Sequence, residues 1–505
     1  MVQYERSDVN LGGRAMRGAA FLAGARLIVR GISLINIVIL ARLLSPEDFG
    51  LAALAFAALG LIQVFSDMRV TDGLLALDDL TPQHLDTAFT MQSLRGFVMG
   101  GLLFLFAAQV SAFMGSAELT PVMQALSVVL ILDGLRNPGY FMYQRNIDYS
   151  REFLRDSVSA VVASAATITI AFMYESYWAL VAGALIQRII QTALTYFRIP
   201  HSPRFTLRYW RDFIGFGAWL TFTGMISQLT DFAPRFLIGR MISPAALGTF
   251  TVGKDTSSLV TQELIAPLQR TLLPSFSAIK NDKERLRRTI VLANRVLLTA
   301  SLPLGFGLAL LAPNVVLILL GPEWTEAVFV LQVLAPTSAI MLGVAATNPM
   351  FMALKKVRAM FARTVLVGIL IWPFLYIGIS TYGLKGAVVA LALSRIPSIF
   401  INAFAMKKYA GVSIVSSLLG GWRAFISVAV MSILIILIPH ETSFDRDAVT
   451  AVLDSVPLVV LGAAVYCFTH VSIWWLSGKP DDLETLAVPR ISRLFRKYFN
   501  NGGTR

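Results

Sequence analysis

Arginine residues recur inside the long apolar stretches of this chain, where a charge is unfavourable. Those with apolar residues on both sides are Arg26, Arg30, Arg95, Arg188, Arg295 and Arg395. An arginine at the centre of a membrane-spanning helix raises the free energy of insertion by about 2.5–3.5 kcal/mol, so it turns toward a wet cavity or a partner. Its guanidinium has a fork of N–H donors that suits phosphate. The pattern predicts a cationic cavity, lined by these arginines, that binds an anion.

Acidic residues in the same stretches are candidates for counter-charges or for ion coupling: Asp67, Asp133, Asp231, Asp255 and Glu263. Asp133 lies three residues before Arg136, and this spacing puts both on one helix face. Asp231 and Arg235 are four residues apart and share a face in the same way. We expect both pairs to be structural ion pairs. The arginines with no acid within one turn of the same helix, which favours ligand binding, are Arg26, Arg30, Arg188 and Arg395.

Motifs for catalysis are weak or missing. Asp445 and Asp447 have the D-x-D spacing of some metal sites, but a match of three residues often arises by chance, and we interpret them as solvated loop charges. The histidines show no ligand spacing, and no G-x-x-x-x-G-K-[ST] phosphate loop occurs. The single cysteine, Cys467, can form neither an internal disulfide nor a cysteine metal cluster. The sequence therefore predicts no enzyme, no metal site and no cofactor.

The composition indicates a membrane protein. Of the 505 residues 56% are hydrophobic and 14% are charged, roughly half the charged fraction of a soluble domain. A spanning helix needs about 20 apolar residues. We predict an all-α integral membrane protein with about fourteen spans, near residues 17–43, 49–76, 87–113, 121–143, 156–174, 178–197, 212–238, 248–272, 289–311, 325–349, 359–379, 384–406, 418–438 and 452–476. The first is too long for a signal peptide, so we expect it to be retained.

The net charge of +13 is distributed as in a membrane protein with both termini in the cytoplasm, and this distribution argues against nucleic acid as a partner. Basic residues cluster in the inner segments, near 6–17, 145–155, 198–211, 280–288, 355–358 and 407–408. The outer loops hold only Lys385 and Arg446, with Arg42 and Arg240 at their edges. This asymmetry follows the positive-inside rule. The acidic inner loop at 77–86 is the exception. The tail at 479–505 is predicted to be a basic amphipathic helix that binds anionic membrane lipids.

A repeat of about 200 residues divides the chain. The sequence ARLLSPEDFG at 41–50 recurs as GRMISPAALG at 239–248, where Ser45 and Ser243 can cap a helix and the following prolines suit its first turn. Arg95 matches Arg295, and Arg188 matches Arg395. Six spans separate the copies, so both halves run the same way through the membrane. We predict lobes at 1–200 (spans 1–6) and 201–411 (spans 7–12), then spans 13–14 at 412–478 and the tail at 479–505.

With these features together, the chain resembles the Wzx-type polysaccharide transporters of the multidrug/oligosaccharidyl-lipid/polysaccharide exporter (MOP) superfamily. The stretches that carry the resemblance are ARLLSPEDFGL at 41–51, LPSFS at 273–277 and GPEWTEA at 321–327. The resemblance implies a MATE-like fold and outward flipping of an undecaprenyl-pyrophosphate-linked oligosaccharide across a bacterial inner membrane, by alternating access around a cationic cavity. It implies polysaccharide polymerase or export machinery as partners. In related peptidoglycan-precursor flippases, basic residues of the first span serve the pyrophosphate, and Arg26 and Arg30 occupy that span here.

Two alternatives remain at this point. A drug/cation antiporter of the same superfamily would favour acids over arginines in its cavity. A membrane scaffold of a polysaccharide synthesis complex would bind its partners and transport nothing.

The charge distribution makes a topology prediction. In a Cys467→Ala background, a single cysteine at position 283 should react only with reagents that reach the cytoplasm. Cysteines that replace Glu118, Glu175 or Asp445 should react from outside, because these positions lie in the outer loops. Labelling of intact cells with an impermeant maleimide measures this, and labelling of position 283 from outside would reverse the orientation.

Overall fold

The computed structural model describes residues 31–66, 80–145, 150–197, 201–213, 218–263, 266–439 and 443–478, with the single positions 24, 28, 29, 70, 74 and 199. Across these residues every regular element is a helix and no strand occurs. The predicted all-α fold is therefore confirmed. The amphipathic tail predicted at 479–505 lies outside the described residues.

The chain divides into two compact units, Met1–Thr251 (the N-terminal unit) and Val252–Arg505 (the C-terminal unit). This boundary falls inside α12 (Pro244–Glu263), whereas the sequence repeat places the end of the first lobe near residue 200. The difference arises because α11 (Ala218–Met241), the first long helix described after that point, packs on α2 (Pro46–Ser66). The division into lobes stays a prediction from the repeat.

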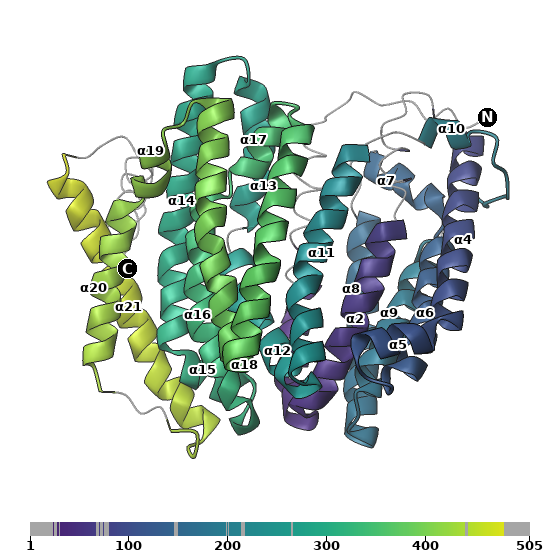
Figure 1. The fold of residues 1–505 in the computed structure, drawn as a ribbon, viewed down its shortest axis with the longest axis horizontal. Helices are drawn as coiled ribbons and strands as arrows, with labels where there is room; N and C mark the ends of the chain where they lie inside the picture. Colours follow the sequence, from purple (N-terminus) through teal and green to yellow (C-terminus); the bar gives the residue numbers. More distant parts are fainter. Residues whose placement is uncertain are drawn as a thin grey trace, which may run out of the picture. The chain divides into compact units, whose positions relative to one another are not determined.

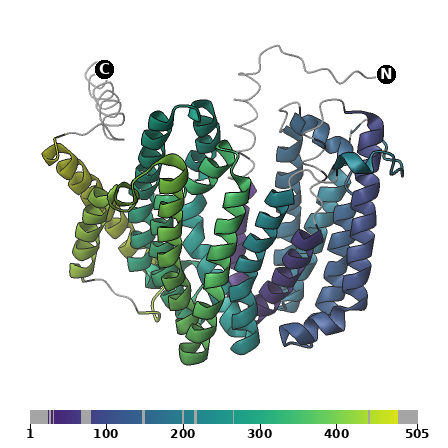
Figure 2. The ribbon, with the colours of Figure 1, turned by 45° about the horizontal axis from the view of Figure 1, so that its top comes forward.

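The N-terminal unit is a bundle of helices whose neighbours are often distant in sequence (Figures 1 and 2). After an apolar helix at Gly31–Leu43 come α2, α4 (Pro82–Leu105), α5 (Ala107–Met114), α6 (Leu119–Gly134), the short 3-10 helix η1 (Pro138–Tyr140), α7 (Phe141–Arg145), α8 (Ser150–Tyr174), α9 (Trp178–Leu194), α10 (Trp210–Phe213) and α11. Helix α6 packs against α2, α4 and α9, and α8 packs against α9. Helix α6 is thus at the centre of the contacts that matter for the site.

The C-terminal unit repeats much of this order. It contains α13 (Ala266–Ile279), α14 (Lys283–Leu310), α15 (Ala312–Leu319), η2 (Pro322–Trp324), α16 (Thr325–Met341), η3 (Leu342–Val344), α17 (Thr347–Ala353), α18 (Val357–Ala410), α19 (Ile414–Leu419), α20 (Trp422–Leu437) and α21 (Ala448–Leu476). Helix α18 is two helices joined at Tyr382 and Gly383, where the backbone leaves helical geometry. Gly383 has a φ of 57°, which glycine adopts without the strain that a Cβ would cause.

The length and hydropathy of the helices agree with a multi-pass membrane protein. Seven described helices are long and apolar enough to cross a membrane, and four shorter apolar helices accompany them. One of the seven is α18, which the break at Gly383 divides into the two spans predicted at 359–379 and 384–406. Each of the other predicted spans overlaps at least one described helix. The count of about fourteen stays a prediction.

The same three-helix arrangement occurs once in each unit. In the N-terminal unit α4, α5 and α6 form it, and in the C-terminal unit α14, α15 and α16 do. Small residues allow the long helices to approach closely: Ser93 donates to the carbonyl of Gly134 at 3.1 Å, and Ser301 donates to the carbonyl of Ala339 at 2.9 Å. Close packing of this kind is typical of helices in membranes.

The segments predicted to face outward gather at one end of the N-terminal unit. Ser45 and Asp48 cap the start of α2 reciprocally, with the Ser45 hydroxyl 2.6 Å from Oδ2 of Asp48 and the Asp48 N–H 3.2 Å from the Ser45 hydroxyl. The other carboxylate oxygen of Asp48 accepts from the N–H of Tyr177 at 2.9 Å. Arg240 donates to the carbonyl of Ala112 at 3.1 Å, near the end of α5.

The two copies of the Ser-Pro signature pack against each other at this end. A Cβ on Gly50 would lie 1.7 Å from the carbonyl oxygen of Pro244, and a Cβ on Gly248 would lie 1.8 Å from that of Pro46. The contact is reciprocal, so the two copies are related by a local twofold arrangement. Only glycine leaves room for such an approach of two backbones.

Segments predicted to be cytoplasmic meet at the opposite end. The connection before α10 lies along the start of α4, where the N–H of Arg204 donates to Oδ1 of Asp86 at 2.9 Å and that of Thr206 donates to the Thr90 hydroxyl at 2.8 Å. Nε2 of His201 lies 3.2 Å from the same Asp86 oxygen, and burial lowers the pKa of this histidine. Asp86, an acid in the exceptional inner loop, therefore fastens the connection between the two predicted lobes.

The reciprocal glycine contact predicts opposite effects of one substitution at two helical glycines. Gly50→Ala should destabilise the protein by about 1–3 kcal/mol, because its methyl group would collide with the Pro244 carbonyl. Gly101→Ala in α4, where a Cβ would meet nothing within 4 Å, should stabilise by about 0.5–1 kcal/mol. Thermal unfolding of the purified protein measures both. An unfolding temperature for Gly50→Ala at or above that of the unaltered protein would contradict the contact.

Candidate functional site

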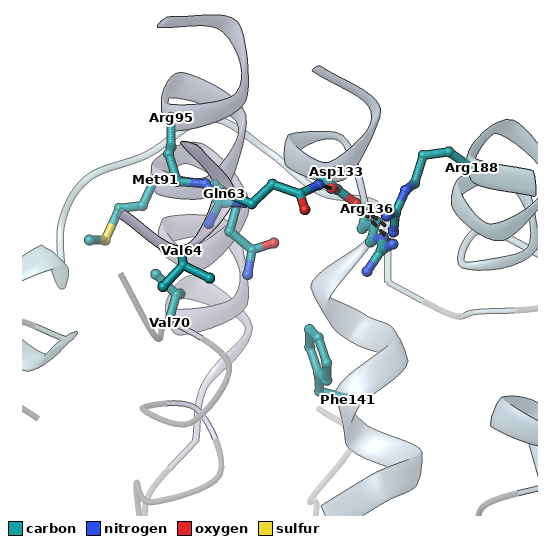
Figure 3. Close-up of a pocket in the computed structure, with 10 residues that line it drawn as sticks. Gln63, Val64, Val70, Met91, Arg95, Asp133, Arg136, Phe141 and Arg188 are labelled. Atoms are coloured by element: carbon teal, nitrogen blue, oxygen red, sulfur yellow. Dashed lines mark hydrogen bonds and ion pairs between the residues drawn. The ribbon is translucent and has the colours of Figure 1, made fainter. Parts of the chain in front are cut away.

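A polar cavity of about 330 Å³ lies inside the N-terminal unit (Figure 3). Residues from α2, α4, α6, α7 and α9, together with Val70, line it: Gln63, Val64, Val70, Met91, Gln92, Arg95, Asp133, Arg136, Phe141 and Arg188. Three of these are arginines: Arg95 on α4, Arg188 on α9 and Arg136 in the turn between α6 and η1. We call it the arginine pocket.

Asp133 is the centre of the interactions in the arginine pocket. Its Oδ1 lies 2.9 Å from Nη2 of Arg136 and 2.9 Å from Nη1 of Arg188. Its Oδ2 accepts from Nε2 of Gln63 at 3.0 Å. The dashed lines in Figure 3 join this carboxylate to the two guanidinium groups. The expected pair of Asp133 with Arg136 is formed, and Arg188, which has no acid nearby on its own helix, shares the same carboxylate.

Gln191 holds the two arginines together. Its Oε1 accepts from Nη2 of Arg136 at 3.4 Å and from Nη1 of Arg188 at 3.3 Å. These are the same two nitrogens that contact Asp133. A neutral acceptor of this kind orients the guanidinium groups without reducing their charge.

The formal charge of the arginine pocket is positive. Arg95, Arg136 and Arg188 contribute three positive charges and Asp133 one negative charge, so the ten lining residues sum to +2. A charge in a partly dry site interacts more strongly than in water. The arrangement suits an anion with several oxygen atoms, since each arginine offers planar N–H donors.

Hydrogen bonds between α6 and α9 place these side chains opposite each other. The Thr192 hydroxyl donates to the carbonyl of Leu132 at 3.1 Å, and the N–H of Asn137 donates to the Thr195 hydroxyl at 3.0 Å. The Leu132 carbonyl, near the end of α6, also accepts from the N–H of Leu135 at 3.2 Å, so the Thr192 hydroxyl is its second donor. Because Asp133 and Arg136 lie between these two anchors, their side chains face Arg188 on α9.

Other predicted site residues lie elsewhere or outside the described residues. Arg26, Arg30 and Asp67 are not described, and neither is the side chain of Glu263. Asp231 and Asp255 are exposed. The structure forms no ion pair between Asp231 and Arg235, although both lie on α11 at a favourable spacing; the side chain of Asp231 is exposed and that of Arg235 is half-buried, so the two lie in different surroundings.

The matched arginines of the C-terminal unit have different surroundings. Arg295 is half-buried in α14, with its Nε 3.1 Å from where a Cβ on Gly420 would lie. Arg395 is exposed on the second half of α18. Helix α16, the counterpart of α6, has its acid, Glu326, in the first turn. The bonds of Ser93 to Gly134 and of Ser301 to Ala339 make Ser338 the counterpart of Asp133. The described residues thus place an acid between arginines in the N-terminal unit, whereas the matching position in the C-terminal unit is a neutral serine.

Sequence reasoning missed the two glutamines that bond to the charged side chains of the arginine pocket. Gln63 and Gln191 are neutral, so no rule about charge in membranes singles them out. Both lie one or two turns from other polar residues on apolar helices, and this spacing was the only feature of the sequence that could have indicated a shared polar site. Arg136 was expected to be a structural partner only, yet it lines the cavity.

The D-x-D sequence has a structural explanation. Its central residue, Arg446, donates to Oδ2 of Asp454 at 2.8 Å and to Oδ1 of Asn314. Asn314 in turn donates to the Ser455 hydroxyl at 2.9 Å. The loop is therefore fastened to α15 and α21 by its arginine. No cluster of three or more metal-ligating side chains occurs among the residues that the structure describes.

Comparison with known proteins identifies the family. The family model described as "Polysaccharide biosynthesis protein" matches residues 39–329. The lipopolysaccharide biosynthesis protein WzxC of Escherichia coli (strain K12) is 22% identical over 417 residues, which cover 82% of this chain and 85% of that protein. The succinoglycan biosynthesis transport protein ExoT of Rhizobium meliloti (strain 1021) is 22% identical over 315 residues, covering 62% and 63% of the two chains.

Solved structures show the fold. The lipid II flippase MurJ, in an inward closed conformation, has a TM-score of 0.72 at 15% identity, covering 89% of this chain and 98% of that one. An inward-facing multidrug resistance MATE family transporter of the MOP superfamily has a TM-score of 0.57 at 14% identity, covering 81% and 98%. The family match spans residues 39–329 of 505, more than half of the chain. This chain therefore belongs to the polysaccharide biosynthesis protein family and has the fold of the MOP superfamily transporters.

Proposed function

We propose that this chain is a flippase that moves an undecaprenyl-pyrophosphate-linked oligosaccharide outward across a bacterial inner membrane, for the biosynthesis of a surface polysaccharide or exopolysaccharide. The names of its relatives support this class, since they refer to lipopolysaccharide biosynthesis and succinoglycan transport. The fold shared with a lipid II flippase supports it as well. Alternating access of the two predicted lobes is the mechanism that a parallel repeat favours.

The charge of the arginine pocket is the observation that carries the proposal. A diphosphate esterified at both ends has one ionised oxygen on each phosphorus and hence two negative charges. The lining residues of the pocket sum to two positive charges. Arginine binds phosphate oxygens through parallel N–H donors, and such charged hydrogen bonds are stronger than neutral ones. We propose that the diphosphate of the substrate binds here.

The size of the pocket limits what enters it. A volume of about 330 Å³ is at the small end of ligand sites, which span roughly 300–1,000 Å³. It suits the diphosphate and excludes most of an oligosaccharide or a long lipid chain. The pocket would therefore recognise the part that all lipid-linked oligosaccharides share, and the sugar sequence would be selected elsewhere.

The proposed function differs from the two alternatives in what the pocket does. A drug/cation antiporter would bring a cation into a site with three arginines, where like charges repel. A scaffold would have no use for a polar cavity that raises the free energy of insertion. We also propose that bond formation in polymer synthesis belongs to partner enzymes, a polysaccharide polymerase or export machinery, and that this chain is a transporter and not an enzyme.

Removal of single arginine charges tests the proposal. Arg188→Gln and Arg95→Gln should each reduce export by about tenfold to a hundredfold, since a hydrogen bond to a charged group contributes about 1.5–3 kcal/mol. Membrane abundance should stay normal for Arg188→Gln, because Asp133 keeps Arg136 and Gln63 as partners. Lysine at position 188 should restore export only in part, because it keeps the charge and loses the fork. Surface polysaccharide and accumulated lipid-linked oligosaccharide are the readouts.

Two further variants complete this experiment. Arg285→Gln, at an exposed position in the first turn of α14, is the matched control and should export normally. The double variant Arg188→Gln with Arg395→Gln examines the matched pair. Normal export by this double variant would contradict the anion site. Low membrane abundance of Arg188→Gln and of Arg395→Gln, each made alone, would support structural roles for these arginines instead.

A further inference from the structure

The acid of the arginine pocket lies behind the two arginines that contact it. The Asp133 side chain is 12% exposed, whereas those of Arg136 and Arg188 are 27% and 26% exposed. The carboxylate is therefore the more deeply buried partner, and the two guanidinium groups face the cavity. An anion that enters the cavity would meet these groups while they contact Asp133.

The contacts of Asp133 leave much of each guanidinium group unused. Nη2 of Arg136 and Nη1 of Arg188 approach the same oxygen, Oδ1 of Asp133, and neither contact has hydrogen-bond geometry. Neither pair is two-pronged, the geometry that makes an arginine–carboxylate pair strong. The Nε of Arg136 is buried and has no hydrogen-bond partner among the described residues. An unsatisfied buried donor is unfavourable, so the guanidinium of Arg136 is not fully satisfied by its present partners.

We infer that Asp133 is a resident competitor of the substrate: it binds Arg136 and Arg188 when the pocket is empty, gives them up when the diphosphate enters, and takes them back when it leaves. The inference rests on the proposed function. A flippase must release its substrate, so a pocket that binds too tightly would slow each cycle. An internal carboxylate limits the affinity, because it lowers the net charge of the pocket from +3 to +2 and offers the arginines another partner.

The two halves of the protein differ in this feature. The arginine of α9 has a counterpart at Arg395, but the last turn of α16 has the neutral Ser338 where α6 has Asp133. The proposed competitor is therefore a feature of the N-terminal unit, whose residues line the arginine pocket.

Binding of inorganic pyrophosphate to the purified full-length protein in lipid nanodiscs tests the inference, with export measured in cells. Asp133→Asn keeps the shape of the side chain and removes its charge. It should bind pyrophosphate about ten to a hundred times more tightly, as expected for the loss of a like charge next to the ligand, while export falls at least severalfold. Asp445→Asn removes an acid from an exposed outer loop and should change neither quantity.

The possible results separate this inference from the proposed function. If the unaltered protein binds no pyrophosphate, the proposed anion site fails and the inference fails with it. If the unaltered protein binds and Asp133→Asn binds equally or more weakly, only the inference is overturned, and Asp133 is a structural partner of the arginines.

A charge-matched pair of variants covers the case in which Asp133→Asn does not insert. Asp133→Asn combined with Arg188→Gln removes one charge of each sign and leaves the pocket at +2, whereas Arg188→Gln alone leaves it at +1. The inference predicts tighter pyrophosphate binding by the double variant than by Arg188→Gln alone. Equal or weaker binding by the double variant would overturn it.

Discussion

The high free energy of arginine charge within a membrane is the constraint from which the architecture of the N-terminal unit follows. Three arginines, on α4, on α9 and in the turn that follows α6, converge on one cavity that contains a single acid, Asp133. An arginine that faced lipid would leave its donors without partners, so the helices that bear these residues must turn them inward and stay together. The same constraint explains the site, because arginine charges that are gathered away from lipid can together bind an anion.

Close helix packing and hydrogen bonds hold the helices around the arginine pocket together. Small residues allow α4 and α6 to pack closely, and hydroxyl groups of α9 bond to the end of α6. At one end of the unit, Gly50 and Gly248 permit two helix starts to touch. At the other end, Asp86 binds the connection that leads to α10. The arginines are therefore held by contacts at both ends of the bundle and beside the pocket itself.

The sequence predicted the fold well because hydropathy and turn chemistry act locally. Apolar length located the helices, and the Ser-Pro signature located the starts of α2 and α12. Arg95 and Arg188 could be predicted as site residues because a charge in an apolar helix requires an explanation wherever it occurs. The partner of Arg188 could not be predicted, because Asp133 is on another helix and only tertiary packing brings them to 2.9 Å. Spacing on one helix misled for Asp231 and Arg235, because it permits an ion pair but does not fix the side-chain rotamers that would form it. Gln63 and Gln191 are neutral and left no charge signal.

The central claim is that the diphosphate of a lipid-linked oligosaccharide binds in the arginine pocket of the N-terminal unit. Electron cryomicroscopy of the full-length protein in nanodiscs, with such a lipid-linked substrate bound, tests it most directly. The account predicts phosphorus density within about 4 Å of the guanidinium groups of Arg136 and Arg188, as phosphate contacts require, with the Asp133 carboxylate turned away from at least one of them. Diphosphate density outside the pocket, with Asp133 still bound to both arginines, would contradict it.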